Sequence, residues 1–175
     1  TASLASNNLP QAKFCLAAVS ISSYGYFGGG YTYPSPSPSG EFLSIVDRLD
    51  FSSETLSQPG SNLPQARTVS GAVSNNSYGY FGGGGIAYAS PALIGGDRVD
   101  RIDFSSETVS APGFNLPETR YGTASVSGGA SQRIKGSRTY GYFGGGFAPP
   151  YVSTIDRLDF SNETTSAPGN NLPQE

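Results

Sequence analysis

The chain has 175 residues, a net charge of −3 at pH 7, no His and a single Cys. The few charged residues with a net negative charge cannot neutralise the phosphates of a nucleic acid, so we expect no nucleic-acid binding. The chain has no run of about 20 apolar residues, so we also expect no membrane insertion. With 24 Gly, 13 Pro, 11 Tyr and 10 Phe, the composition favours many short strands joined by tight turns over disorder. No stretch has helical spacing of its apolar residues. We therefore expect an all-β protein.

Most of the chain consists of one sequence pattern that occurs three times. The phrase SYGYFGGG begins at residue 23 and returns, nearly unchanged, at residues 77 and 139. The phrase VDRLDFSSET begins at residue 46 and returns at residues 99 and 155. The repeat length is about 54 residues, and a unit of that size holds about four short strands. We therefore divide the chain into three four-stranded repeats, 1–61, 62–114 and 115–175.

The second repeat shows the four expected strands in chain order. Small and β-branched residues predict the first strand at 66–74, and the aromatic run before the glycines predicts the second at 78–81. The run DRVDRIDF predicts the third strand at 97–104, and ETVSA predicts the fourth at 107–111. The scaffold of the repeats is then a set of glycine pairs and arginines: Gly28, Gly29, Gly82, Gly83, Gly144, Gly145, Arg48, Arg101 and Arg157.

The third strand carries apolar residues on both of its faces. Ile102 points to one side and Val99 to the other, because successive strand residues alternate. Such a pattern is typical of a sheet that is covered on each side by a similar sheet. We expect Arg48, Arg101 and Arg157 to bridge to carboxylates of the same or the adjacent repeat. A threefold ion pair of this kind indicates architecture rather than catalysis.

The order of these elements resembles the kelch repeat of β-propellers. Leu-Pro-x-x-Arg/Lys, a strand of small residues, Tyr-Gly-Tyr-Phe-Gly-Gly, a variable loop and Asp-Arg-x-Asp-Phe follow one another over essentially the whole chain. Lys13, Arg67 and Arg120 match the basic position of that family, whereas the absence of Trp departs from it. The phrase YGYFGGG with IDRLDFSNET also resembles repeat-rich structural, fibre-type proteins of marine phages. These resemblances imply kelch-like propeller blades.

Three blades cannot close a ring, since propellers typically have 4–8 blades. Residues 1–5 repeat the outer strand and have no blade of their own, and the chain has no initiator Met, which predicts a processed or excerpted chain. We expect the ring to be completed by further repeats of the same chain or by a homo-oligomer. Two copies would supply six blades.

The loops between the second and third strands differ from repeat to repeat. They are rich in Tyr, Pro and Ser, and a longer insert at 128–138 is basic. Their aromatic side chains are suited to stack on sugar rings, or they pack within an assembly. The candidate ligand or assembly residues are Tyr31, Tyr33, Tyr88, Phe147, Tyr151, Arg133, Lys135 and Arg138. Asn75 and Asn162 fit the N-glycosylation pattern.

Enzyme chemistry finds little support in the sequence. Without His there is no imidazole base, no His metal ligand and no Ser-His-Asp triad. Cys15 lacks partners for a zinc site, and its alignment with Val69 predicts a buried small side chain. We expect no catalytic residues, no metal and no cofactor, and hence no enzyme.

The sequence therefore predicts a structural, non-enzymatic repeat protein. Its expected role is a building block of a larger homomeric or multi-repeat assembly, such as a virion or extracellular fibre. The alternative is a carbohydrate-binding or adhesion module that grips glycans through the variable aromatic loops.

Overall fold

Antiparallel strands make up the regular structure of this protein. A computed structural model describes residues 8–33, 39–89, 92–128 and 139–173. Within these ranges every regular element is a β-strand, so the described chain holds no helix that could cross a membrane. The strands form several open sheets, and none of the described sheets closes into a barrel. The expectation of an all-β protein is confirmed.

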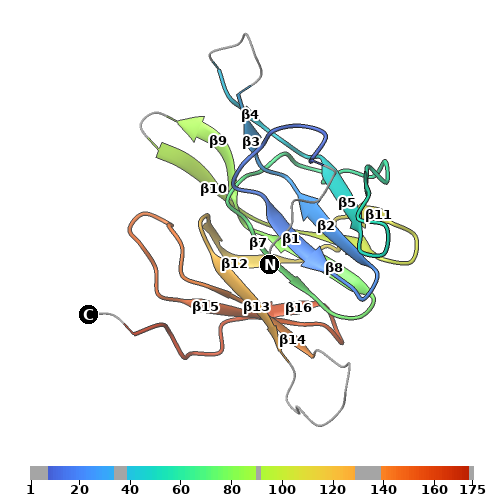
Figure 1. The fold of residues 1–175 in the computed structure, drawn as a ribbon. Coiled ribbons are helices and arrows are strands. Elements are labelled where there is room, and N and C mark those ends of the chain that lie inside the picture. Colours follow the sequence, from blue (N-terminus) through green and yellow to red (C-terminus); the bar gives the residue numbers. More distant parts are fainter. Residues whose placement is uncertain (1–7, 34–38, 90–91, 129–138, 174–175) are drawn as a thin grey trace, which may run out of the picture.

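Three sheets follow one another along the chain, each with four strands in sequential antiparallel order (Figure 1). The first sheet contains β1 (Ala17–Ser20), β2 (Tyr24–Gly28), β5 (Val46–Asp50) and β6 (Leu56–Ser57). The second contains β7 (Gly71–Ser74), β8 (Tyr78–Gly82), β10 (Ala92–Asp103) and β11 (Thr108–Ser110). The third contains β13 (Ala124–Gly128), β14 (Tyr140–Gly144), β15 (Ile155–Asp159) and β16 (Thr164–Ser166).

Four further strands extend this pattern at the variable loops. β3 (Tyr31–Thr32) and β4 (Glu41–Phe42) form a short hairpin of their own. β9 (Gly85–Ala89) and β12 (Asn115–Arg120) both pair with the long strand β10. The second sheet is therefore the largest, and β10 reaches well beyond its counterparts.

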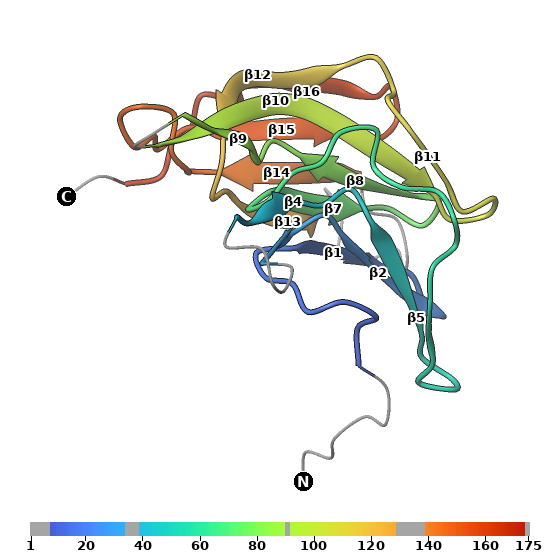
Figure 2. The ribbon, with the colours of Figure 1, turned by 90° about the horizontal axis from the view of Figure 1, so that it is seen from above.

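The second sheet lies between the other two. Figure 1 shows the blue strands β1 and β2 on one side of the green strands β7 and β8 and the orange and red strands β13 to β16 on the other, and in Figure 2 β1 and β2 lie apart from β14 and β15. β7 contacts both β1 and β13. The register repeats as well, because Tyr26 pairs with Arg48, and Tyr80 pairs with Arg101 in the same way.

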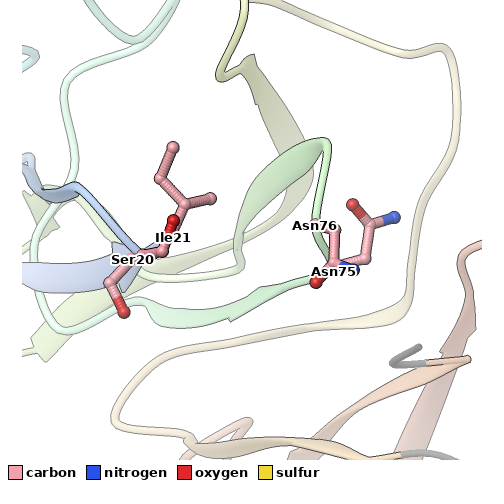
Figure 3. Close-up of a pocket in the computed structure, with 5 residues that line it drawn as sticks. Ser20, Ile21, Asn75 and Asn76 are labelled. Carbon is pink, nitrogen blue, oxygen red and sulfur yellow. The ribbon is translucent and has the colours of Figure 1, made fainter. Parts of the chain in front are cut away.

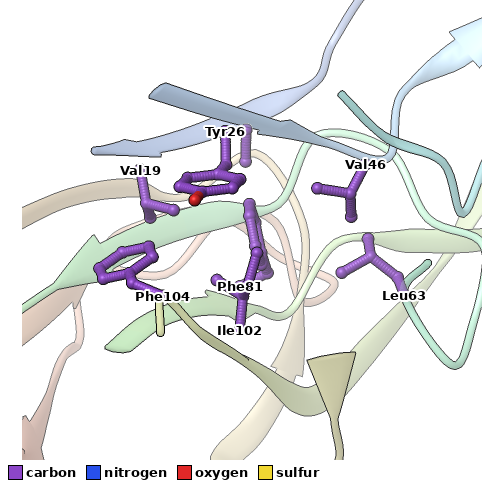
Figure 4. Packing of buried hydrophobic residues seen from close by; sticks show 8 residues of the cluster. Val19, Tyr26, Val46, Leu63, Phe81, Ile102 and Phe104 are labelled. Carbon is purple, nitrogen blue, oxygen red and sulfur yellow. The ribbon is translucent and has the colours of Figure 1, made fainter. Parts of the chain in front are cut away.

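Two hydrophobic clusters fill the spaces between consecutive sheets. Between the first and second sheets, Val19 and Tyr26 pack against Phe81, Ile102 and Phe104 (Figure 4). The second cluster lies between the second and third sheets and contains Val73, Tyr80, Val99, Leu116, Phe143, Leu158 and Phe160. Ile102 and Val99 thus point to opposite sides of β10, so the two-faced pattern predicted for this strand is confirmed.

Glycines in the aromatic strands let the sheets approach closely. A Cβ on Gly79 would lie 2.6 Å from Cγ2 of Val19, and a Cβ on Gly141 would lie 2.5 Å from Cγ2 of Val73. The glycine that follows each strand also needs a left-handed backbone. Gly29 has φ +72° and passes close to the carbonyl oxygen of Arg67 in the next repeat.

The predicted first strand of the second repeat is too long at its start. Residues 66–70 are outside β7, because Val69 adopts φ 47° and turns the chain. The side chain of Arg67, which precedes this turn, is fully buried. The other predicted strands of this repeat match β8, β10 and β11, although β10 begins earlier, at Ala92. The outer strand predicted at residues 1–5 lies outside the described residues.

The prediction that Cys15 is buried is wrong. Its side chain is exposed, and its φ of 55° is left-handed. Val69 and Gly122 share this conformation at φ 47° and 70°, so the position is a recurrent turn rather than a core site. The Cys15 carbonyl accepts a hydrogen bond from Val69 N at 2.8 Å, which joins the first two repeats.

Candidate interaction surfaces

Each repeat contains one buried ion pair. Lys13 Nζ lies 2.6 Å from Asp47 Oδ2, Arg67 pairs with Asp100, and Arg120 Nη2 lies 2.7 Å from Asp156 Oδ2. These six side chains have almost no exposed surface. Sequence reasoning noted the three basic residues but did not find their partners. The signal was available, since an Asp precedes the Arg of the third strand in every repeat.

Arg67 connects the segment before β7 to the rest of its own sheet. Its Nη1 donates to the carbonyls of Gly83 at 3.1 Å and Arg98 at 2.8 Å, and its Nη2 pairs with Asp100. Its backbone carbonyl accepts from Gly30 N of the preceding repeat at 2.8 Å. Burial lowers the pKa of the Arg67 guanidinium, so Asp100 offsets a substantial desolvation cost.

A second set of polar contacts joins one repeat to the next. Tyr26 Oη donates to Glu107 Oε1 at 2.9 Å, and Arg48 Nη1 donates to both carboxylate oxygens of Glu107 at 2.8 and 2.9 Å. Burial, followed by the hydrogen bond to Glu107, raises the pKa of Tyr26. Hydrogen bonding to the same carboxylate raises the pKa of Arg48.

The next junction repeats this arrangement. Tyr80 Oη donates to Glu163 Oε1 at 2.9 Å, and Arg101 Nη1 lies 2.6 Å from the same oxygen. Burial likewise raises the pKa of Tyr80. The sequence left open whether Arg48 and Arg101 pair with a carboxylate of their own repeat or of the adjacent one. In the structure each pairs with a Glu of the adjacent repeat.

The glutamate of each junction sits in a strained but repeated turn. Glu107 and Glu163 have φ 54° and 53°, a conformation rare for side chains of this size. Asp103 holds the turn by accepting from Ser105 N at 2.8 Å and from Ser105 Oγ at 2.6 Å. These hydrogen bonds, the hydroxyl's first, hold the pKa of Asp103 below its usual value.

The corresponding positions of the third sheet have different surroundings. Among the described residues Arg157 forms no ion pair, and its guanidinium lies 4.9 Å from the ring centroid of Tyr140. Tyr142 is only partly buried, whereas Tyr26 and Tyr80 are fully buried. This face of the third sheet therefore carries the same side chains without the contacts seen at the two junctions.

The loop aromatics form two separate groups. Tyr31, Tyr33 and Tyr88 come together with two residues that the sequence analysis did not single out, Phe14 and Phe42. The ring centroids of neighbours lie 5.1–6.2 Å apart. Tyr33 and Tyr88 are exposed, while Tyr31 is buried at the centre of the group. We call these five residues the aromatic cluster.

The second group belongs to the third repeat. Phe147 lies 5.0 Å from Tyr151 and 5.3 Å from Tyr121, measured between ring centroids. The structure thus does not unite the five predicted aromatic residues in one site. The sequence analysis missed Phe14 and Tyr121, because each precedes the first strand of its sheet in the chain. Phe14 is brought to the loop by a backbone bridge to Tyr31, and Tyr121 by a backbone bridge to Phe147. Arg133, Lys135 and Arg138 lie outside the described residues.

The two asparagines of the glycosylation pattern are both used in turns. Asn75 Oδ1 accepts from Ser77 N and Tyr78 N at 2.7 Å, and Asn162 Oδ1 accepts from Thr164 Oγ1 at 2.7 Å. Asn75 also lines a surface hollow of about 470 Å³ between the first two sheets. Figure 3 shows Asn75 and Asn76 on one side of this hollow and Ser20 and Ile21 on the other. It holds no cluster of charged groups.

Known proteins offer a likeness in fold. No protein family and no curated protein matches the chain in sequence. Among 138 matching chains of solved structures is one titled "Structure of YjhT". The two are 15% identical, the match covers 91% of this chain and 54% of that chain, and the TM-score is 0.69. This chain therefore spans about half the length of YjhT, and the likeness shows the fold alone.

The prediction that the chain is not an enzyme is corrected by this likeness. The likeness to YjhT shows a fold, and a fold does not exclude catalysis, so the firm exclusion does not stand. The exclusion depended on the absence of His, yet Tyr, Asp and Glu also serve as general acids and bases. In the described part of the chain no group of three or more His, Cys, Asp or Glu side chains is placed to hold a metal ion.

Proposed function

We propose that this chain is a structural repeat protein whose three sheets are kelch-like blades of a larger β-propeller or repeat array. The observation that carries this proposal is the repeated junction, in which a Tyr and an Arg of one sheet bind a Glu of the next. The same contacts occur at two consecutive junctions, which indicates that each four-stranded sheet is a repeat unit that stacks on the next. The likeness in fold to YjhT, of which the chain covers about half, supports the same interpretation.

The proposed assembly is built from copies of this unit. Propellers typically have 4–8 blades, so three blades need further ones to complete a ring. We propose a virion or extracellular fibre as its setting, on the resemblance of the repeats to fibre-type phage proteins. The partner is then either a homo-oligomer or further repeats of the same kind.

The mass of the native protein tests this proposal. Sedimentation equilibrium of the purified 175-residue chain is expected to give a multiple of 18.1 kDa that increases with concentration. Native mass spectrometry should give the same multiple. A mass of one chain at every accessible concentration would contradict an assembly of separate copies.

Carbohydrate binding is a second candidate, favoured by the aromatic cluster. Its exposed rings Tyr33 and Tyr88 present apolar faces with hydroxyl groups at the rim, which suits stacking on a sugar ring. The double variant Tyr33→Ala/Tyr88→Ala is expected to lose capture on a glycan array. Tyr151→Ala, in the other aromatic group, is the matched control and should keep it. An array that stays blank with the unmodified chain would end this hypothesis.

A further inference from the structure

The two internal junctions use one pair of complementary faces. We call the tyrosine face the surface that in the first sheet carries Val19, Tyr26 and Arg48, and in the third sheet Val126, Tyr142 and Arg157. We call the phenylalanine face the surface that in the second sheet carries Phe81, Ile102 and Phe104, and in the first sheet Phe27, Leu49 and Phe51. At each internal junction the tyrosine face of one sheet covers the phenylalanine face of the next.

The valine position shows where a tyrosine face is left uncovered. Val19 and Val73 are 6% and 2% exposed, because each packs over a glycine of the next sheet. Val126 occupies the equivalent place in β13 and is 63% exposed. An exposed apolar side chain at a position buried twice elsewhere indicates a surface suited to the same kind of neighbour.

The phenylalanine position shows the opposite face uncovered in the first sheet. Phe104 and Phe160 are 7% and 9% exposed, and each stacks on a tyrosine of the preceding sheet, at 5.3 Å for Phe104 on Tyr26. Phe51 is 46% exposed. It lies over Gly25, the counterpart of the glycines that receive Val19 and Val73.

The charged groups of these two outer faces are complementary. Arg157 has no ion-pair partner in the described part of the chain. Glu54 is exposed on the first repeat and has φ 54°, the conformation in which Glu107 and Glu163 receive their Tyr and Arg. A positive group on the third sheet and a negative group on the first thus match the charges of the internal junctions.

We propose that the tyrosine face of the third sheet docks on the phenylalanine face of the first sheet in a second copy of this chain, head to tail. In this junction Phe51 of one copy stacks on Tyr142 of the other, and Glu54 accepts from Tyr142 and Arg157. This proposal rests on the proposed function as a stacking repeat and names its contact surface. The contact joins two different surfaces, so it is heterologous. Two such junctions can close two copies into a ring, and further copies can extend them into an open array.

The length of YjhT agrees with two copies. This chain covers 54% of it, so a pair has about the size of the whole YjhT chain. Six sheets also fall within the usual number of propeller blades.

Val126→Lys is the variant that tests the docking. Its side chain is exposed in the single chain, so the β-sheet circular dichroism should not change, while a buried Lys would prevent the junction. The unmodified chain is expected to sediment as two copies or more, and Val126→Lys as one. Ile94→Lys is the matched control, because Ile94 is an exposed apolar strand residue outside both faces, and it should sediment as the unmodified chain.

A charge exchange tests the assigned ion pair. Arg157→Glu is expected to weaken self-association at least tenfold, and adding Glu54→Arg in the same chain should restore it. A double variant that stays dissociated would overturn the pairing of these two residues.

The outcomes separate this inference from the proposed function. If the unmodified chain assembles and both Val126→Lys and Arg157→Glu still assemble, the docking surface is wrong while the structural role stands. If the unmodified chain is a single copy at every concentration, the docking and the assembly from separate copies are both overturned.

Discussion

Val73 and Val126 hold the same position in two sheets of the same strand order, yet one is buried and the other exposed. Their local structure does not explain this, because Val73 pairs with Tyr80 in the same register as Val126 with Tyr142. The difference is the neighbouring sheet, which covers Val73 and is absent over Val126 among the described residues. The stability of this protein is therefore shared between sheets and the junctions that join them, as in repeat proteins generally.

The largest expected effect lies inside a repeat, at the buried ion pair. Arg67→Ala removes the fully buried partner of Asp100, which then keeps only its pair with the partly exposed Arg98, and it removes two hydrogen bonds to carbonyls. We expect the free energy of unfolding to fall by about 3–5 kcal/mol, measured by urea denaturation. Arg67→Lys is the control, since Lys13 fills the equivalent place in the first repeat, and it should lose clearly less. A loss below about 1 kcal/mol for Arg67→Ala would show that the pair is not needed.

The next largest effect on stability is expected at Val73, compared with Val126. Val73→Ala removes two methyl groups that fill the space over Gly141, and about 2 kcal/mol of stability should be lost. Val126→Ala should change the stability of the single chain by less than about 0.5 kcal/mol. Equal losses in urea denaturation at low protein concentration would mean that the junction does not set the difference.

The sequence predicted the all-β fold because strand and turn residues recur with the same spacing in each repeat. It located β8 and β11 well, since the aromatic run and the Ser-Ser-Glu-Thr turn are local signals. It placed residues 66–70 in a strand because nothing in their composition reveals that Val69 takes a left-handed φ. It also missed the partner of Arg67, which is distant in sequence and is selected only when the sheet brings Asp100 beside it.

The aromatic cluster shows the same limit for the candidate site. Tyr31, Tyr33 and Tyr88 were found because they lie in the Tyr-rich loops that differ from repeat to repeat. Phe14 and Phe42 join them only through the backbone bridge of Phe14 to Tyr31 and the pairing of β3 with β4. Contacts of this kind depend on three-dimensional packing rather than on spacing in the chain.

A smaller effect is expected where arginine crosses a junction. Arg48→Met removes the hydrogen bonds from Arg48 Nη1 to both carboxylate oxygens of Glu107. The free energy of unfolding should fall by about 1–2 kcal/mol, because both side chains are partly exposed to solvent. Arg157→Met should cost less than about 0.5 kcal/mol in the single chain, as it breaks no ion pair there. Thermal denaturation of the two variants side by side measures the contrast. If Arg157→Met were the more harmful change, the outer face would have to carry contacts of its own.

The smallest expected effect concerns the turn that presents the glutamate, which all three repeats share. The hydrogen bonds from Ser105, together with the charge of Arg101, lower the pKa of Asp103 in the folded protein. Its stabilisation is therefore fully present above the unfolded-state pKa of about 3.9 and is lost as the pH falls through the lower folded-state value. Urea midpoints between neutral pH and pH ~2 should decline less steeply for Asp103→Asn than for the unmodified chain. Ser105→Ala removes the hydroxyl that contributes most to the shift, so it should also flatten this decline, whereas an unchanged slope would show that the turn contributes nothing to acid sensitivity.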